Sequence, residues 1–317
     1  MSTTTSPDLI HAQGALAGTA SKQPAKTRHI RKTRPALASV GAGSKPLRAV
    51  GVVLATIWLV FVLVPIYYMI LTSFRSESQY LSANPWLPTG GLSTSSYSAV
   101  FQGSGIATDF RNSAEFAAGT IALVVGLSLA AAWRIVTHPS RFGRLSFRLL
   151  LAGLAIPIQA IVIPIFVIVV KLHIYDKLYT LVLVTAASLC SVSVLLMVSY
   201  VRGIPRELFD AMRVDGASEW TIFLRLVVPM SRPIIATVSI YAGLGAWNNF
   251  LLPLILTQSN NDTVLPLGLF KFSTASEYGV NVPVVMAAVL LSVLPLLALY
   301  IGLRRQFVKG LGGLALQ

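Results

Sequence analysis

The sequence predicts an all-α integral membrane protein with six transmembrane helices. Of its 317 residues, 55% are hydrophobic and 11% are charged, and the mean hydropathy is +0.72. An ordinary soluble domain carries about 25% charged residues, so this composition excludes that class. Six runs without Asp, Glu, Lys or Arg reach or approach the roughly 20 residues that a spanning helix needs. These runs are residues 49–74, 116–133, 149–170, 178–201, 233–261 and 278–303.

The positive charges predict how these spans are oriented. Cytoplasmic loops of membrane proteins carry an excess of Lys and Arg. If both termini are cytoplasmic, the inner segments contain 20 Lys and Arg residues and the outer segments contain five. We therefore expect both termini and the loop at 202–232 in the cytoplasm. This distribution also accounts for the net charge of +14. Because no basic groove or stacking platform accompanies the charge, nucleic-acid binding is not expected.

The orientation is testable with single cysteines on the two sides of the membrane. After replacement of the native Cys190, an impermeant thiol reagent should label Ser95→Cys in intact cells and should not label Ser218→Cys. Both variants should be labelled once the membrane is permeabilised. The reversed pattern would contradict the orientation and, with it, any cytoplasmic role for the loop at 202–232.

The spans predict that transport energy comes from another subunit. They contain no carboxylate or histidine, which proton- or sodium-coupled carriers usually need inside the bilayer. The chain also lacks a Gly-x-x-x-x-Gly-Lys-Ser/Thr phosphate loop. The one cysteine, Cys190, has no partners at ligand spacing, so we expect no metal site. A transporter of this sort would take its work from a separate ATPase that binds the ATP, so no catalytic residue and no cofactor are expected in this chain.

A polar segment at 205–229 lies between two apolar runs and predicts a short helix–turn–helix. Pro205 suits a first helical turn, and Glu207 places negative charge near the positive end of the helix dipole. Gly216 is expected to adopt the left-handed conformation that ends a helix, and Ser218 is expected to cap the next helix. The first helix is expected to present a short apolar face made by Leu208, Ala211 and Met212.

The same segment resembles the coupling loop, called the EAA loop, of bacterial ABC importer permeases. That pattern is Glu-Ala-Ala, three residues, Gly, nine residues, and Ile-x-Leu-Pro. Here Asp-Ala-Met at 210–212, Gly216 and Leu-Val-Val-Pro at 226–229 keep the spacing. The residues Arg-Val-Asp-Gly-Ala-Ser at 213–218 are very close to the form found in carbohydrate importers. Two of the three opening residues depart from the pattern, including Met212 in place of the usual alanine.

Further motifs extend the resemblance over about residues 112–309, to the shorter permease subunit of carbohydrate ABC importers of the maltose type. They are Ile-Pro at 156–157 with Ile-Pro-Ile-Phe at 163–166, Trp-Asn-Asn-Phe-Leu-Leu-Pro at 247–253, Thr-Val-Leu-Pro-Leu-Gly-Leu at 263–269 and Gln-Phe-Val-Lys-Gly-Leu at 306–311. The cytoplasmic turn at 133–142 lacks the usual Ala-Tyr-Ala-rich run. The resemblance implies the type I ABC importer permease fold.

The resemblance also implies a machine and a set of sites. The machine contains a heterodimer of two permeases, two ATPase subunits and an extracytoplasmic sugar-binding protein, in the inner membrane of a bacterial cell. The outer loop at 257–283 would reach the binding protein. The residues expected to couple to the ATPase are Glu207, Asp210, Ala211, Arg213, Asp215 and Gly216. The residues that line the sugar path, or alternatively pack span against span, are Trp247, Asn248 and Asn249.

Several alternatives stay open at this level. A helix lying on the membrane would need a larger apolar face and a basic polar side, whereas Glu207, Asp210 and Asp215 are acidic. A permease of the same superfamily for a polyamine, phosphate or peptide is the main alternative. A channel or secondary carrier lacks the charged residues it would need, and a membrane scaffold would leave the loop unexplained.

The chain is expected to have four parts. Residues 1–46 form a disordered basic cytoplasmic tail, which serves as a topology anchor or lies on anionic membrane lipid. Residues 47–111 form the first transmembrane helix and an outer loop. Residues 112–304 form the permease domain with its coupling loop, and residues 305–317 form a cytoplasmic tail.

Overall fold

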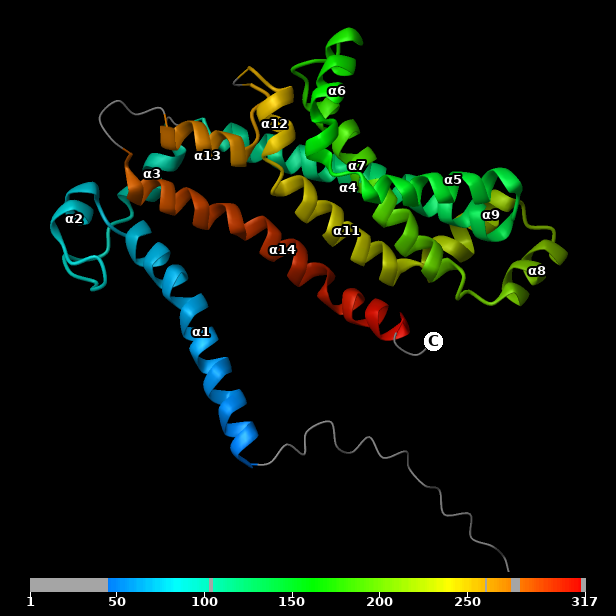
Figure 1. Ribbon diagram of the computed structural model, residues 1–317, viewed down its shortest axis with the longest axis horizontal. Helices are drawn as coiled ribbons and strands as arrows, with labels where there is room; N and C mark the ends of the chain where they lie inside the picture. Colours follow the sequence, from blue (N-terminus) through cyan, green and yellow to red (C-terminus); the bar gives the residue numbers. More distant parts are fainter. Residues whose placement is uncertain (1–44, 103–104, 260, 275–279, 315–317) are drawn as a thin grey trace, which may run out of the picture. The chain divides into compact units, whose positions relative to one another are not determined.

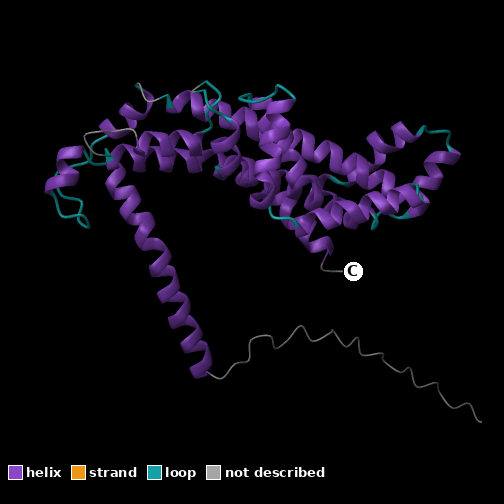
Figure 2. Ribbon diagram, turned by 45° about the horizontal axis from the view of Figure 1, so that its top comes forward, coloured by secondary structure: helices purple, strands orange, loops and turns teal. Residues whose placement is uncertain are grey.

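The structure is a computed structural model that describes residues 45–102, 105–259, 261–274 and 280–314. Most of the predicted tail at 1–46 therefore lies outside the described residues. The described residues contain helices and no strand (Figure 2). The elements are α1 (Lys45–Ser73), α2 (Glu77–Ser82), α3 (Ser95–Phe101), α4 (Ile106–Thr137), α5 (Arg141–Ala152), η1 (Gly153–Ala155), α6 (Ile158–Lys171), α7 (Leu178–Val201), α8 (Arg206–Val214), α9 (Glu219–Ile222), η2 (Phe223–Val227), α10 (Val228–Met230), α11 (Arg232–Trp247), α12 (Leu251–Leu256), α13 (Leu265–Thr274) and α14 (Val282–Leu314).

Four helices are long and apolar enough to cross a membrane, and there are up to six spans if each of two bent helix pairs counts as one. The four are Ala49–Ser73 within α1, α4, α7, and Val282–Gly302 within α14. The bent pairs join α5 with α6, and Glu219–Met230 with α11. By length and composition, the upper count agrees with the six spans predicted from the sequence.

The third predicted span, at 149–170, is not one straight helix. The helices on either side of Ile156 and Pro157 meet at a bend of 110°. A proline disfavours the helical conformation in the residue before it, and Ile156 is extended with φ −97° and ψ 111°. Residues 149–152 therefore belong to α5, residues 153–155 form η1, and α6 covers the predicted run from Ile158 onward.

The fifth predicted span, at 233–261, is also interrupted. α11 ends at Trp247, the next three residues are not helical, and α12 begins at Leu251. The side chain of Asn249 accepts a hydrogen bond from Leu252 N at 3.2 Å, so an amide side chain satisfies the start of α12 and stabilises the break. Another bend, of 75°, separates Glu219–Met230 from α11.

Two hydrophobic clusters follow one another along α4. Phe116 and Trp247 belong to the first cluster, while Val124 and Phe209 belong to the second. Figure 1 shows α4 beside α7 and α11, and these three helices pack against one another. The chain divides within α1 into units 1–57 and 58–317, and every contact described below lies inside the second unit. The second cluster positions the segment that the sequence singled out.

Candidate coupling and translocation sites

Residues 205–230, the predicted coupling segment and called the coupling element below, fold as the sequence predicts at their turn. Gly216 has φ +78°, which confirms the predicted left-handed conformation. Its N–H donates to Arg213 O at 3.0 Å, and Ala217 N donates to Met212 O at 2.9 Å, so the last carbonyls of α8 are satisfied. Ser218 Oγ accepts from Thr221 N at 3.2 Å and caps α9, as predicted.

Arg213 fixes the angle between the two short helices. Its Nε donates to Glu219 Oε1 at 2.9 Å, across the turn, and its Nη1 lies 3.3 Å from Asp210 Oδ1 on its own helix. His138, just after α4, lies 3.7 Å from the second oxygen of Glu219. Exposed ion pairs of this sort contribute little stability one at a time. Together they connect α8, α9 and the end of α4.

The apolar face of α8 is rotated relative to the prediction. Phe209 is 4% exposed and packs with Met212 against the second cluster, so the inner face was only partly predicted. Leu208 and Ala211 are exposed instead. Successive residues of an α-helix are rotated by about 100° around its axis. Which of two adjacent faces is buried therefore depends on the helices that pack against it, and the local sequence does not contain that information.

The outward side of the coupling element carries large apolar groups. Val214 is 88% exposed and Trp220 is 62% exposed. Glu207, Asp210, Ala211 and Asp215 are exposed on the same short segment. Exposed apolar side chains rimmed by charged ones are typical of protein–protein contact sites. The element is therefore held on one side by its own chain and open to a partner on the other.

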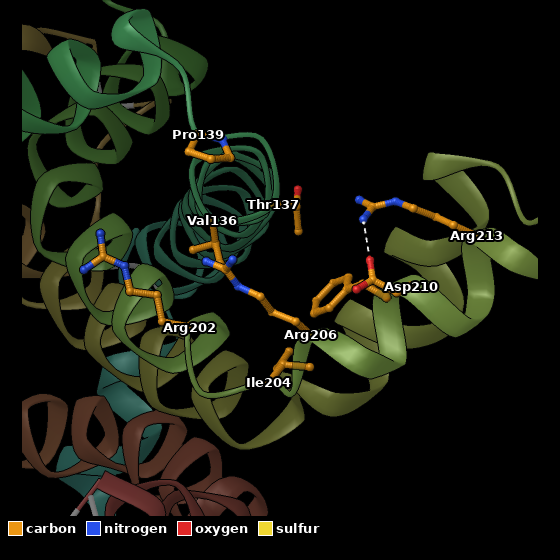
Figure 3. A pocket seen from close by; sticks show the side chains of 9 residues that line it. Val136, Thr137, Pro139, Arg202, Ile204, Arg206, Asp210 and Arg213 are labelled. Atoms are coloured by element: carbon orange, nitrogen blue, oxygen red, sulfur yellow. Dashed lines mark hydrogen bonds and ion pairs between the residues drawn. The ribbon is translucent and has the colours of Figure 1, made fainter. Parts of the chain in front are cut away.

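A basic pocket of about 210 Å³ lies between the end of α4, the end of α7 and α8 (Figure 3). Arg202, Arg206 and Arg213 line it together with one carboxylate, Asp210, which pairs with Arg213. The guanidinium of Arg202 lies 5.7 Å from the ring centroid of Phe147. Sequence reasoning assigned Arg202 and Arg206 only to the charge bias. Their position after the fourth span was the available signal for a site that favours an acidic group.

The residues at 247–249 separate into packed and exposed positions. Trp247 is buried, its Nε1 donates to Ser292 O at 3.0 Å, and its ring meets Phe110 edge-on at 5.4 Å. Asn249 donates from Nδ2 to Thr185 Oγ1 at 3.3 Å. Asn248 is exposed, and its amide donates within its own helix at 3.0 Å. Of the three, Asn248 alone is exposed, whereas Trp247 and Asn249 contact neighbouring helices.

The predicted outer loop at 257–283 is anchored at its start. Asp176 Oδ1 accepts hydrogen bonds from Gln258 N at 2.8 Å, Ser259 N at 3.0 Å and Ser259 Oγ at 3.2 Å. Partial burial raises the pKa of Asp176, but these hydrogen bonds and nearby Lys177 outweigh it, so the pKa is lowered. The resulting stabilisation is present above the unfolded pKa and is lost as the pH falls through the folded pKa.

The described residues hold no group of three or more His, Cys, Asp or Glu side chains that could bind a metal ion.

Several named proteins are similar to most of the chain. A putative ABC transporter permease protein of Caldicellulosiruptor sp. strain Rt8B.4 is 32% identical over 255 residues, covering 80% of this chain and 92% of that protein. The arabinooligosaccharides transport system permease protein AraQ of Halalkalibacterium halodurans is 30% identical, covering 78% and 88%. The diacetylchitobiose uptake system permease protein NgcG of Streptomyces coelicolor is 28% identical, covering 85% and 89%.

A solved structure shares the fold. It is a chain from the crystal structure of a bacterial ABC transporter involved in the import of the acidic polysaccharide alginate. The TM-score is 0.75 at 20% identity, over 84% of this chain and 99% of that chain. The family model for the binding-protein-dependent transport system inner membrane component matches residues 122–312. The chain therefore belongs to the family of binding-protein-dependent transport system inner membrane components and is a multi-pass membrane protein.

Proposed function

We propose that the chain is the membrane-spanning permease subunit of an ATP-driven sugar importer. The observation that carries the proposal is the coupling element, whose inner face packs on the spans while Val214 and Trp220 are exposed. A cytoplasmic ATPase with a receiving cleft would bury this outer face. Relatives named for arabinooligosaccharides, diacetylchitobiose and melibiose, raffinose or stachyose support a sugar as the cargo.

The proposed complex contains a second permease subunit, two ATPase subunits and an extracytoplasmic sugar-binding protein. ATP binding would close the ATPase dimer and draw the coupling elements together, and the spans would then open outward. The family description supports a bacterial inner membrane as the location. Catalysis and nucleotide binding belong to the ATPase, so this chain supplies no catalytic residue and no cofactor site.

Residues of α1 inside the second unit present an apolar surface for lipid or a further membrane subunit. Trp58 is 68% exposed and Phe61 is 70% exposed in a helix of spanning length. In a bilayer such a surface contacts lipid or another helix, and a second permease would cover part of it.

The proposed function is tested by purifying the intact complex and reconstituting it in liposomes. The chain should co-purify with an ATPase, and binding protein loaded with its sugar should stimulate ATP hydrolysis and drive sugar uptake. A panel of oligosaccharides would name the cargo. Stimulation by a polyamine, phosphate or peptide alone would replace sugar as the cargo class, and purification of a stable chain without any ATPase would contradict the proposal.

A further inference from the structure

One helix reaches both surfaces that the proposed function uses. α4 contains 32 residues without interruption and is therefore about 48 Å long. Its first turns lie against the outer segment, defined here as residues 257–259 and 261–274. Its last turn lies against the coupling element. The outer end of α4 makes its contacts through buried polar groups, and the other end makes them through aromatic rings and charged groups.

The outer end of α4 holds the outer segment with buried polar groups. Asn112 Nδ2 donates to Asn261 O at 2.6 Å and to Thr263 O at 2.9 Å. Ser113 Oγ accepts from Leu265 N at 2.7 Å. Asn112 and Ser113 are 2% and 0% exposed. A buried polar group that loses its partner destabilises the folded protein, so these bonds hold the segment firmly.

A close approach of α13 to α4 completes this attachment. A Cβ atom at Gly268 would lie 2.6 Å from Cγ and 3.3 Å from Cβ of Asp109. No residue larger than glycine fits there while Asp109 keeps its place. Lys271 Nζ, one turn further along α13, donates to Thr263 Oγ1 at 3.2 Å and ties the helix back to the anchored loop. We call the Asn112, Ser113 and Asp109–Gly268 contacts the outer clamp.

The other end of α4 contacts the coupling element through rings and charge. Trp133 lies 5.0 Å from Phe223, measured between ring centroids, and His138 lies 3.7 Å from Glu219. Between the two ends, the inward side of α4 is buried in the packing with α7 and α11, for example at Phe116 and Val124. A helix packed along its length transmits displacement because packed interiors are not freely deformable.

We propose that α4 is the rigid connection through which the outer segment and the coupling element move together, and that Asn112, Ser113 and the Asp109–Gly268 contact are its positioning residues. The inference rests on the proposed function, in which a sugar-binding protein docks at the outer segment and an ATPase docks at the coupling element. The competing arrangement is an outer segment that separates from α4 during each cycle.

The first test removes the two Asn112 hydrogen bonds of the clamp without changing side-chain volume greatly. In the reconstituted complex, Asn112→Leu should leave basal ATP hydrolysis and ATPase co-purification unchanged. Stimulation by the sugar-loaded binding protein should fall by about fivefold or more, within the ordinary range of coupling between sites. Asn84→Leu, the same replacement in the outer loop before α4, is the matched control and should keep full stimulation. Equal stimulation in Asn112→Leu and wild type would overturn the proposal.

The second test replaces the clamp with a covalent bond. The Cβ separation of 3.3 Å between positions 109 and 268 is close to the roughly 3.5–4.5 Å of a disulfide, so Asp109→Cys with Gly268→Cys should cross-link after Cys190→Ser. The oxidised complex should transport as well as the reduced one. Oxidation should also restore stimulation when Asn112→Leu is added.

The outcomes distinguish failure of the α4 connection from failure of the proposed function. Transport that stops on oxidation and returns on reduction would show that the outer segment must leave α4, which overturns the connection. Failure of the disulfide to form would contradict the contact itself. A wild-type complex that no sugar-loaded binding protein stimulates would instead refute the proposed function.

Discussion

Replacing Gly216 with valine should leave the chain in the membrane and abolish transport-coupled ATP hydrolysis. Gly216 has φ +78°, and no atom lies within 4 Å of a Cβ built there, so the effect acts through the backbone alone. The left-handed conformation costs a non-glycine residue roughly 1–2 kcal/mol, and a β-branched one is disfavoured most. α8 and α9 would then meet at a different angle, and the partner cleft would not receive them.

Two control variants give this prediction its specificity. Gly91→Val introduces the same strain at φ +83°, also with no atom within 4 Å, in the outer loop away from the coupling element. It should retain uptake. Gly216→Asn should retain much of it, because asparagine tolerates the left-handed region. Membrane content, ATPase co-purification and sugar-stimulated hydrolysis would be measured for each. Wild-type stimulation in Gly216→Val would show that residues 205–230 are not the coupling element.

Asn248 and Asn249 should respond differently to the same replacement by leucine. Asn249→Leu removes the donor to Thr185 Oγ1 and the cap on Leu252 N, so α7 and α12 lose a shared contact and the yield of assembled complex should fall. Asn248→Leu changes an exposed side chain whose hydrogen bond lies within its own helix. Assembly and basal hydrolysis should survive, and sugar uptake should fall if the residue lines the path.

The pair is informative because the two residues are adjacent and the chemical change is identical. Uptake per assembled complex and the amount of assembled complex would be measured separately. Full uptake in Asn248→Leu would exclude Asn248 from the path. Normal assembly in Asn249→Leu would show that its bridge to Thr185 does not hold the break between α11 and α12.

Local patterns predicted the features that depend on local physics. The charge-free runs located the spans, and the glycine at 216 and the serine at 218 gave the turn and the cap of the coupling element. Pro157 and Pro253 mark interruptions of the third and fifth runs, whereas the 110° size of the bend at Pro157 and the position of the break at Asn249 depend on packing and were not predicted. The predicted buried face of α8 contained Leu208 and Ala211, whereas Phe209 is buried instead. Phe209 packs on helices that are distant in the sequence, so its neighbours in the chain do not indicate its burial.

The sites that were missed depend on distant partners. Asn112 bonds to Asn261 and Thr263, which are 149 and 151 residues away in the chain. The pocket that joins Arg202 and Arg206 to the end of α4 also requires helices that meet only after folding. From the sequence alone, these arginines were topology signals and Asn112 was an unremarked residue at the start of a span.

The central claim is that the coupling element meets a cytoplasmic ATPase while the outer segment faces a binding protein. A photo-cross-linking amino acid at Val214, which is 88% exposed on α8, tests it directly, with the same group at exposed Phe270 on α13 as the counterpart. In intact cells, the Val214 probe should cross-link to the ATPase subunit, and the Phe270 probe should cross-link to the sugar-binding protein. An ATPase cross-link from Phe270, or none from Val214 in a complex that still transports, would contradict the account.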